Sequence, residues 1–356
     1  MKKMRKVMGL LRVNWRTIVE FEILYKLLSF SIFTPVFWGI FNGIMRMMGY
    51  EYLTIENILS FLINPVTLAV LLVLFVCMAV YTMIDIGAVI FLLDQSYQGK
   101  KADLLQTVGY AVRNAVRVFQ RKNILIVFAV LFLIPFLNIG VASSYVGSIA
   151  VPEFILDFIK GNARLLLLFL VALAGLGIVL LRWMYAFHYF TLEGCGFKEA
   201  RKKSADLGSK SKLKDLAVLL GIQLGISVLF FVPAMAGIWL AVLLGGLFSR
   251  LKLFGIVSAS VVWVYLAVSL LVVSMLGTPV SYACISILFY GHKEEKKEAV
   301  IHGEADGRRE KEKGKKIRYA VEGGLLAVSV VCCCFYLYGV YNHKVTYRLN
   351  MSGQWR

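Results

Sequence analysis

The chain has 356 residues, of which 59% are hydrophobic and 17% are charged, and its mean hydropathy is +0.75. This composition exceeds that of water-soluble domains and excludes a disordered chain, a coiled coil, collagen and a disulfide-rich secreted scaffold. The formal net charge is +18. In a membrane protein, basic loops on the cytoplasmic side are the first explanation of such an excess, so nucleic-acid binding is not needed to account for it.

Seven apolar stretches are long enough, at about 20 residues, to cross the hydrocarbon layer of a membrane. They predict an all-α integral membrane fold with seven transmembrane helices. The predicted spans are Phe21–Ile44, Val66–Leu93, Ile124–Asn138, Leu165–Phe190, Leu216–Leu240, Ile256–Phe289 and Ala320–Tyr341.

The basic residues predict the orientation of these spans. If the N-terminus is cytoplasmic, 29 Lys and Arg residues fall in the inside segments and eight in the outside segments. The positive-inside rule therefore predicts a multi-pass cell-membrane protein with a cytoplasmic N-terminus and an extracytoplasmic C-terminus. We expect residues 1–318 to form a polytopic domain with basic cytoplasmic loops, and residues 319–356 to form an exit helix with a short outer tail.

The prolines show an internal repeat. Pro35, Pro135 and Pro233 are separated by 100 and 98 residues, and each lies in the outer half of an odd-numbered span. The inner ends of the even-numbered spans repeat as well. We therefore predict three tandem two-helix hairpins followed by one exit helix. The repeated inner ends are Phe91–Asp94, Phe190–Glu193 and Phe289–Gly291.

Two apolar amphipathic stretches interrupt the outer side of the first two repeats. They are Thr54–Ile63 and Pro152–Ile159. Both are too short to cross a membrane, so we predict helices that lie in its outer interface.

A basic helix is predicted at the inner end of the first repeat. Its apolar stripe, formed by residues from Leu104 to Phe119, carries basic residues on an adjacent face. Such a helix is expected either to lie on anionic lipid or to dock on the inner loops of its own bundle, and the stripe alone does not choose between these partners. The predicted anionic-lipid contacts are Lys100, Lys101, Arg113, Arg117, Arg121 and Lys122.

Two charges fall inside predicted spans at the same depth. Asp85 and Arg182 each lie about eight residues from the inner end of their span, counted at 1.5 Å per residue. Because ionisable groups within a membrane are costly unless paired, we predict that they form an ion pair. The pair would either lock two repeats together or serve as a gate or headgroup-phosphate site.

The sequence offers no pattern for chemistry on this chain. We find no Ser/His/Asp grouping, no phosphate-binding glycine loop and no metal-ligand spacing. We therefore expect no catalytic residue, no metal site and no cofactor.

Short motifs along the chain resemble a known family when they are taken in order. Together they resemble the membrane domain of bacterial membrane-associated glycerophosphoryl diester phosphodiesterases, and the similarity covers essentially the whole chain. The motifs are Asn14-Trp15-Arg16 ahead of Phe21–Leu28, Leu53–Asn57 leading to Asn64-Pro65, Leu93-Asp94 with Gly99–Lys101, Leu181–Trp183 and Glu193-Gly194.

The resemblance implies a membrane domain that precedes an extracytoplasmic catalytic barrel. That barrel cleaves glycerophosphodiesters to glycerol 3-phosphate and an alcohol, using a His-Arg pair, a Glu-x-Asp metal pair and a later His. None of the four histidines here precedes an arginine, and Glu304-Ala305-Asp306 lies in a highly charged loop. The roughly 15 residues after the last span are too few for a barrel of about 250 residues. We therefore expect the anchor of a longer protein or a free-standing relative.

Three functional hypotheses follow. In the first, the chain anchors a glycerophosphodiester phosphodiesterase of lipid metabolism, acting in cis or in trans, and presents lipid substrate to it. In the second, it is a transporter or lipid-translocating protein with no hydrolase partner, which the repeats and intramembrane charges would suit. In the third, it is a structural anchor that binds no ligand.

Overall fold

A computed structural model gives the fold of the protein. It describes residues 2–50, 55–120, 123, 125–130, 161–207, 211–247, 275–296 and 301–302. Within these ranges every regular element is a helix, as predicted from the sequence. The chain forms two units, one of Met1–Ile18 with Ala79–Ala305 and one of Val19–Met78 with Asp306–Arg356.

The N-terminal helix α1 (Lys2–Val13) is amphipathic. Val7, Leu10 and Leu11 are buried, whereas Arg5 and its other basic neighbours on the opposite face are exposed. This spacing of apolar residues at three and four positions is that of a helix lying on the body of its unit.

A single helical stretch follows, and its regular hydrogen bonding is interrupted before Pro35. It consists of α2 (Trp15–Leu28), a π-helical turn η1 (Ser29–Phe33) and α3 (Thr34–Met47). Pro35 has no N–H group, and its ring crowds the carbonyl four residues earlier, at Ser31. The widened π turn accommodates this proline without ending the helix.

The short amphipathic helix predicted over Thr54–Ile63 is confirmed as α4 (Ile55–Ile63). Its buried Phe61 packs edge-on against Phe41 of α3, with ring centroids 5.9 Å apart, and against Tyr50 at 5.8 Å. These aromatic contacts fix one face of α4, while Ile63 on another face is exposed.

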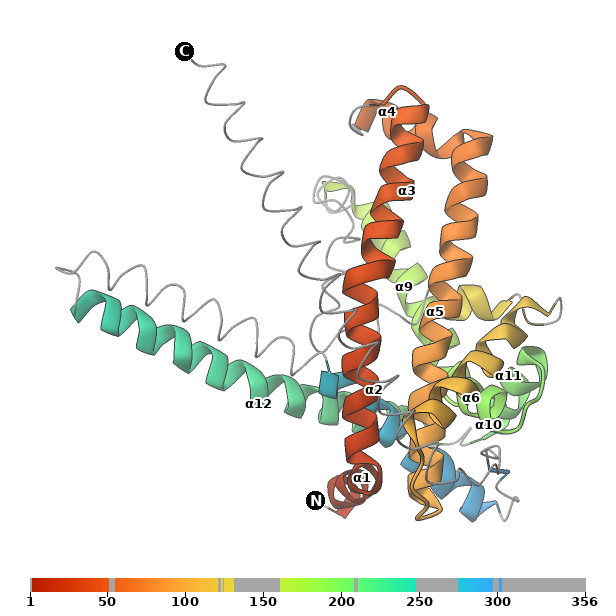
Figure 1. The fold of residues 1–356 in the computed structure, drawn as a ribbon, viewed down its shortest axis with the longest axis vertical. Helices are drawn as coiled ribbons and strands as arrows, with labels where there is room; N and C mark the ends of the chain where they lie inside the picture. Colours follow the sequence, from red (N-terminus) through yellow and green to blue (C-terminus); the bar gives the residue numbers. More distant parts are fainter. Residues whose placement is uncertain are drawn as a thin grey trace, which may run out of the picture. The chain divides into compact units, whose positions relative to one another are not determined.

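Helix α5 (Pro65–Tyr97) passes through two different surroundings (Figure 1). Asn64 precedes it and accepts a hydrogen bond from the Val66 N–H at 2.9 Å, so the helix begins with a capping residue and a proline, a combination typical of helix starts. Most large apolar side chains from Val66 to Phe75 are exposed, although Leu74 is buried, whereas residues 85–96 are all buried.

Three helices lie in the same unit as the buried part of α5: α6 (Leu104–Val116), α10 (Ala186–Leu192) and α11 (Phe197–Asp206) (Figure 1). The Phe91 and Tyr110 rings stack at 4.3 Å, and the Tyr110 hydroxyl donates to a carbonyl of α10 at 2.6 Å. A short 3-10 turn, η2 (Arg117–Phe119), ends the first of these helices.

The predicted span Leu165–Phe190 is broken into two helices. α9 (Ala163–Trp183) ends before a turn at residues 184 and 185, and α10 follows. Ser204 explains the break, because its hydroxyl donates to the Arg182 carbonyl at 2.8 Å and accepts from the Tyr185 N–H at 3.1 Å. A side chain inserted in this way replaces the regular helical hydrogen bonds.

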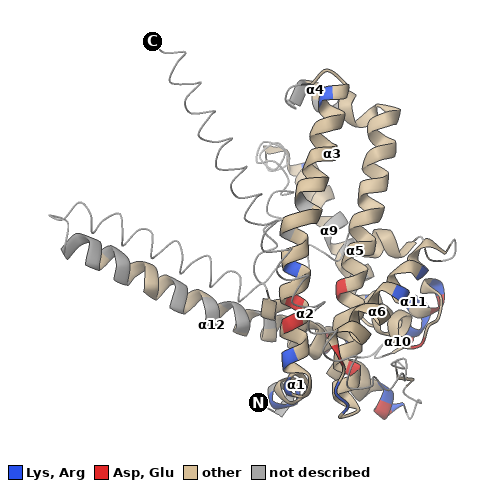
Figure 2. Ribbon diagram, in the orientation of Figure 1, with Lys and Arg blue, Asp and Glu red and all other residues tan. Residues whose placement is uncertain are grey.

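The remaining long helices carry mostly apolar sequence. α12 (Lys212–Leu247) is continuous through Pro233, and residues 275–295 are also helical. Many large apolar side chains of α9 and α12 are exposed, including Leu168 and Leu224. Figure 2 shows that charged residues gather on α1, on α11 and near the end of α5, whereas the described part of α12 carries few.

Two described stretches are long and apolar enough to cross a membrane. They are Trp15–Met47, with a mean hydropathy of 1.5, and Pro65–Tyr97, with a mean hydropathy of 2.6. They coincide with the first two predicted spans. Three other predicted spans are described only in part. Ile124–Asn138 is described up to residue 130, and Ile256–Phe289 is described from residue 275. In Leu216–Leu240 the helix is described, but only some of its side chains are. Ala320–Tyr341, Pro135 and Pro152–Ile159 lie outside the described residues.

A buried asparagine closes the first repeat at its inner end. Asn14 is 3% exposed, and its Oδ1 accepts from the Ala102 N–H at 3.0 Å. Its Nδ2 donates to Ser96 Oγ and to the Lys100 carbonyl, both at 2.9 Å. Asn14 therefore ties the start of the first hairpin to the loop that ends it.

A second asparagine makes one similar contact, through its Oδ1, in the predicted second repeat. Asn123 Oδ1 accepts from the Phe197 N–H at 2.9 Å, and its Nδ2 donates to the Arg117 carbonyl at 2.8 Å. Asn14 and Asn123 both precede the first helix of their repeat, so the predicted repeat extends to these hydrogen bonds.

We predict that Asn14→Ala lowers the free energy of unfolding by about 1–3 kcal/mol, because it leaves the N–H of the buried Ala102 without its acceptor. The midpoint of thermal unfolding in detergent, at one heating rate, measures the change. Gln106→Ala is the control, since this half-exposed side chain of α6 makes no hydrogen bond among the described residues. Equal shifts for both variants would contradict the predicted role of Asn14.

Candidate functional site

One short segment at the end of the helix over residues 275–295 binds the other parts of its unit. We call the polar residues of this segment, Tyr290, His292, Lys293 and Glu294, the polar hub. Each makes a hydrogen bond or ion pair to a residue at least 77 positions away in the sequence. The hub therefore joins the inner ends of all three predicted repeats.

The first hub contact is a hydrogen bond to the first repeat. The Tyr290 hydroxyl donates to Oδ1 of the fully buried Asp94 at 2.6 Å. Gln98 and His302 also contact this carboxylate, each at 2.9 Å. Burial and the Asp94 charge both raise the pKa of Tyr290, so its hydroxyl stays protonated and remains a donor.

A stacked tyrosine pair lies next to that hydrogen bond. The Tyr97 and Tyr290 rings stack at 4.0 Å, and the Tyr97 hydroxyl donates to Glu294 Oε1 at 2.5 Å. The hydrogen bond to Glu294 raises the pKa of Tyr97 to about 12. The end of α5 is therefore held to the hub by ring contacts and by two hydrogen bonds.

The second hub contact is a buried ion pair with the second repeat. Lys293 Nζ lies 2.5 Å from Glu193 Oε1, and the Lys293 side chain is 3% exposed. Lys203 binds the other carboxylate oxygen, Oε2, at 2.9 Å from a more exposed position. Hydrogen bonds to Glu193 and Glu199 raise the pKa of Lys203, which keeps it charged.

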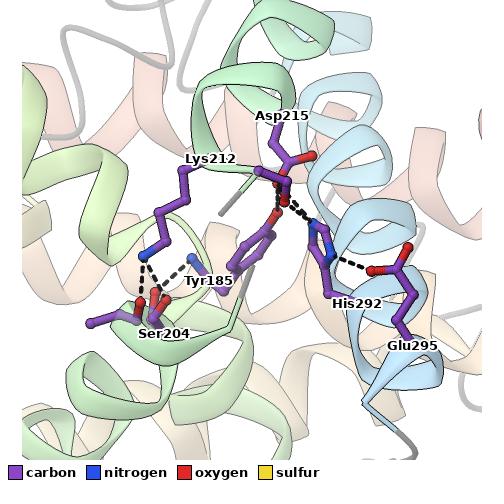
Figure 3. Close-up of polar contacts among 8 residues, drawn as sticks. Tyr185, Ser204, Lys212, Asp215, His292 and Glu295 are labelled. Carbon is purple, nitrogen blue, oxygen red and sulfur yellow. Dashed lines mark hydrogen bonds and ion pairs between the residues drawn. The ribbon is translucent and has the colours of Figure 1, made fainter. Parts of the chain in front are cut away.

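The third hub contact is a cluster around Asp215, near the start of α12 (Figure 3). His292 Nε2 lies 2.8 Å from Asp215 Oδ2, and its Nδ1 lies 3.2 Å from Glu295 Oε2. The hydroxyls of Tyr185 and Ser211 donate to the same Asp215 oxygen at 3.0 and 3.3 Å. Both ring nitrogens of His292 therefore face carboxylates.

Lys212 holds the end of α11 beside this cluster. Its Nζ donates to the carbonyls of Ser204 and Ala205 at 3.0 and 2.9 Å (Figure 3). A cation at this position satisfies carbonyls left open at the end of a helix. Burial lowers the pKa of Lys212, and the positive charge of Arg182 lowers it further.

The Asp215 cluster contains serine, histidine and aspartate but lacks the geometry of a hydrolase triad. In a triad, the serine and the aspartate face opposite nitrogens of the imidazole. Here Ser211 lies 3.2 Å from Nε2 of His292, and Asp215 lies closer to that same nitrogen. A nitrogen that donates to Asp215 cannot accept the serine proton, so the cluster clamps the helices without activating a nucleophile.

The structure does not bring the predicted partners Asp85 and Arg182 together. Asp85 is buried within electrostatic range of Tyr282, whereas the Arg182 side chain is exposed and lies near Lys212. No ion pair between the two is found among the described residues. The prediction of equal depth counted residues along one continuous helix over Leu165–Phe190. Because a turn follows α9, this count does not give the depth of Arg182.

The predicted anionic-lipid contacts divide into two groups. Lys100, Lys101 and Arg113 are exposed, as such contacts require. Arg117 instead docks on its own chain: its guanidinium donates to carbonyls of Phe190, Gly194 and Cys195, and stands 4.6 Å over the Phe190 ring. Arg121 and Lys122 lie outside the described residues.

The sequence contained a signal for the hub that residue-by-residue reading missed. Asp94, Glu193 and His292 occupy the third position after the repeated Phe91, Phe190 and Phe289. Equivalent positions in a repeat come together when its units pack around a common axis. Asp215 and Ser211, in contrast, carry no such signal. Within the described ranges, no three metal-ligating side chains gather at a potential metal site.

We predict that Lys293→Met lowers the free energy of unfolding by about 3 kcal/mol, since it removes the buried partner of Glu193 and leaves only the more exposed Lys203 on that carboxylate. Lys203→Met is the matched control on the same carboxylate and should cost less than about 1 kcal/mol, because Lys203 is solvent-exposed. Denaturant titration in mixed micelles measures both. The double variant Lys293→Met with Glu193→Gln should recover part of the loss. Equal effects of the two lysines would contradict the hub.

Comparison with known proteins places the chain in a family. Curated proteins give no match, and solved structures give none either. One family model, for the membrane domain of glycerophosphoryl diester phosphodiesterase, matches residues 4–334 and so covers most of the chain. The resemblance carried by the sequence motifs is thereby confirmed, and the chain belongs to the family of glycerophosphoryl diester phosphodiesterase membrane domains.

Proposed function

We propose that this chain is a multi-pass membrane domain that anchors a glycerophosphodiester phosphodiesterase and presents membrane lipid to its catalytic domain. The observation that carries the proposal is the family match over residues 4–334. Exposed apolar faces on α5, α9 and α12 support it, because soluble proteins rarely leave such surfaces open to water.

The proposed topology has seven spans, a cytoplasmic N-terminus and an extracytoplasmic C-terminus. The distribution of Lys and Arg supports this orientation. The polar hub supports it as well, since buried ion pairs and exposed lysines belong at the aqueous end of a helical bundle.

Helix α4 is our candidate for contact with lipid at the outer surface. Its Phe61 is anchored on α3, while Leu62 and Ile63 are exposed, Ile63 to 68%. A fixed amphipathic helix with exposed aliphatic side chains suits the boundary between headgroups and acyl chains. The catalytic domain would hang on this side, so α4 could hold lipid close to it.

We assign the hydrolysis to a separate catalytic domain, in cis or in trans. The carboxylates of Asp94, Glu193 and Asp215 are all engaged by hydroxyl groups or basic side chains of this chain. Groups held in this way are not available as acid and base for a substrate.

A second candidate function is lipid or solute translocation, and one observation favours it. His188 and Tyr282 are fully buried at the depth of predicted spans, and His188 Nδ1 and the Tyr282 hydroxyl have no hydrogen-bond partner among the described residues. Asp85 lies within electrostatic range of Tyr282. Ionisable groups inside a membrane bundle mark transport pathways in many proteins.

The topology is tested with reporter fusions in the full chain. We expect fusions at Gly99, Ser209 and Gly303 to report a cytoplasmic position and a fusion after Tyr341 to report an extracytoplasmic one. A cytoplasmic position after Tyr341 would remove the seventh span and contradict the anchoring proposal.

Lipid presentation is tested with a fusion protein in which a catalytic domain of the same enzyme family follows residue Arg356. We expect Ile63→Lys to lower the release of the head-group alcohol from glycerophospholipid in vesicles at least fivefold, since the lysine weakens the contact of α4 with acyl chains. Hydrolysis of soluble glycerophosphocholine should not change. Gly49→Ala is the control. It changes the turn before α4, where Gly49 has a left-handed backbone conformation (φ 77°), without adding a charge.

The two substrates separate the possible results. Equal losses on both would mean that the variant damages the enzyme as a whole and would overturn presentation by α4. Unchanged hydrolysis of both would also overturn it. Uptake or translocation of lipid by the chain without a catalytic domain would favour the second candidate.

A further inference from the structure

Helix α6 has one face fixed against its own chain. The buried side chains Leu104, Thr107, Ala111 and Asn114 lie on this docked face. Its Tyr110 and the adjoining η2 residue Arg117 bind carbonyls of α10 and of the turn that follows it. The orientation of α6 about its own axis is therefore set by these contacts.

The opposite face of α6 is apolar and exposed. Leu105, Val112, Val116 and Phe119 are 40%, 42%, 57% and 64% exposed, and their spacing of seven, four and three residues keeps them in one stripe. Val108 completes the stripe at half burial. We call these five residues the outer stripe. The sequence analysis placed Leu104 in the same apolar stripe as these residues, whereas the structure places it on the docked face.

Helix α11 offers an internal comparison, because it occupies the corresponding place in the second repeat. Phe197, Ala200 and Ser204 form its docked face. Its exposed residues are all charged, among them Lys198 and Lys202. Figure 2 shows the charges along α11, whereas α6 carries few. The outer face of α11 is therefore charged and suited to contact with water, whereas the outer face of α6 is not.

Most charges around the outer stripe are basic, and the exception is Asp103, which directly precedes α6. Arg113 is exposed and lies on the flank of the stripe, and Lys100 and Lys101 are exposed just before α6. The sequence from Leu104 to Phe119 contains no acidic residue. A helix with exposed aliphatic and aromatic residues and a basic flank has the composition of one that lies on anionic lipid.

We propose that the outer stripe of α6 lies in the headgroup region of the membrane and that Arg113 and Lys101 bind anionic phospholipid there. The inference adds a lipid contact outside the spans and does not depend on lipid presentation or on a catalytic domain. The sequence left open whether this helix contacts lipid or its own bundle. In this proposal α6 does both, because it docks on its own chain with one face and contacts lipid with the other.

The test uses the full chain with the photoreactive residue p-benzoylphenylalanine at Val116. The protein is reconstituted in vesicles that contain equal amounts of phosphatidylglycerol and phosphatidylcholine in both leaflets, so the outcome does not depend on orientation. Illumination should give lipid adducts at position 116, detected by mass spectrometry, and phosphatidylglycerol should be over-represented among them. The same probe at Lys202 of α11 should give few or no lipid adducts.

Charge variants test the anionic preference. Each basic residue near such a surface contributes about 1 kcal/mol, which corresponds to about a fivefold enrichment. Arg113→Gln should therefore lower the phosphatidylglycerol enrichment up to about fivefold, and Arg113→Lys should keep it. Lys202→Gln is the matched control on α11 and should leave the enrichment unchanged. High salt should reduce the enrichment, because a Debye length of about 3 Å at 1 M screens the charges.

Three results would overturn the proposal. Adducts between two copies of the chain at position 116 would assign the stripe to self-association. The absence of lipid adducts would leave the stripe in water or under other protein. Adducts with no preference for phosphatidylglycerol would remove the role of Arg113. An unchanged thermal midpoint in each variant shows that folding is intact, as expected for substitutions at exposed positions.

Discussion

The packing of the described inner helices depends on the ion pair between Lys293 and Glu193. Both side chains are almost completely buried, and a charge buried without its partner costs several kcal/mol. Lys293 can therefore be accommodated only when α10 brings Glu193 to it. The neighbouring Tyr290 and His292 are placed at the same time, because they lie within one turn of the same helix. One pair thus aligns the contacts to Asp94 and Asp215.

The need for such a polar cluster follows from the properties of a membrane. Apolar helices gain nothing from burial against each other when lipid tails are equally apolar, so their association rests on packing and polar contacts. In this chain the aromatic and charged contacts concentrate where the helices end. Phe91, Phe190 and Phe289 are fully buried there, and removing them from water is favourable at that end. The hub therefore supplies association energy that the lipid-facing helices lack.

Sequence periodicity predicted the elements whose identity depends on local pattern. α4, α6 and the continuous helix α5 appear where amphipathic or apolar stretches indicated them. The break after α9 could not be predicted, because it depends on Ser204, which lies about twenty residues further along the chain. The docking of Arg117 could not be predicted either, and the sequence analysis assigned this residue to lipid. Its hydrogen-bond acceptors are backbone carbonyls, which cannot be recognised from residue types.

The contacts of the hub involve matching positions of the three predicted repeats. The third position after each repeated phenylalanine is Asp94, Glu193 or His292. The third unit departs from the pattern, and its His292 and Lys293 supply groups that pair with carboxylates. The predicted repeats therefore differ at one polar position of the hub, and the outer faces of α6 and α11 differ as well.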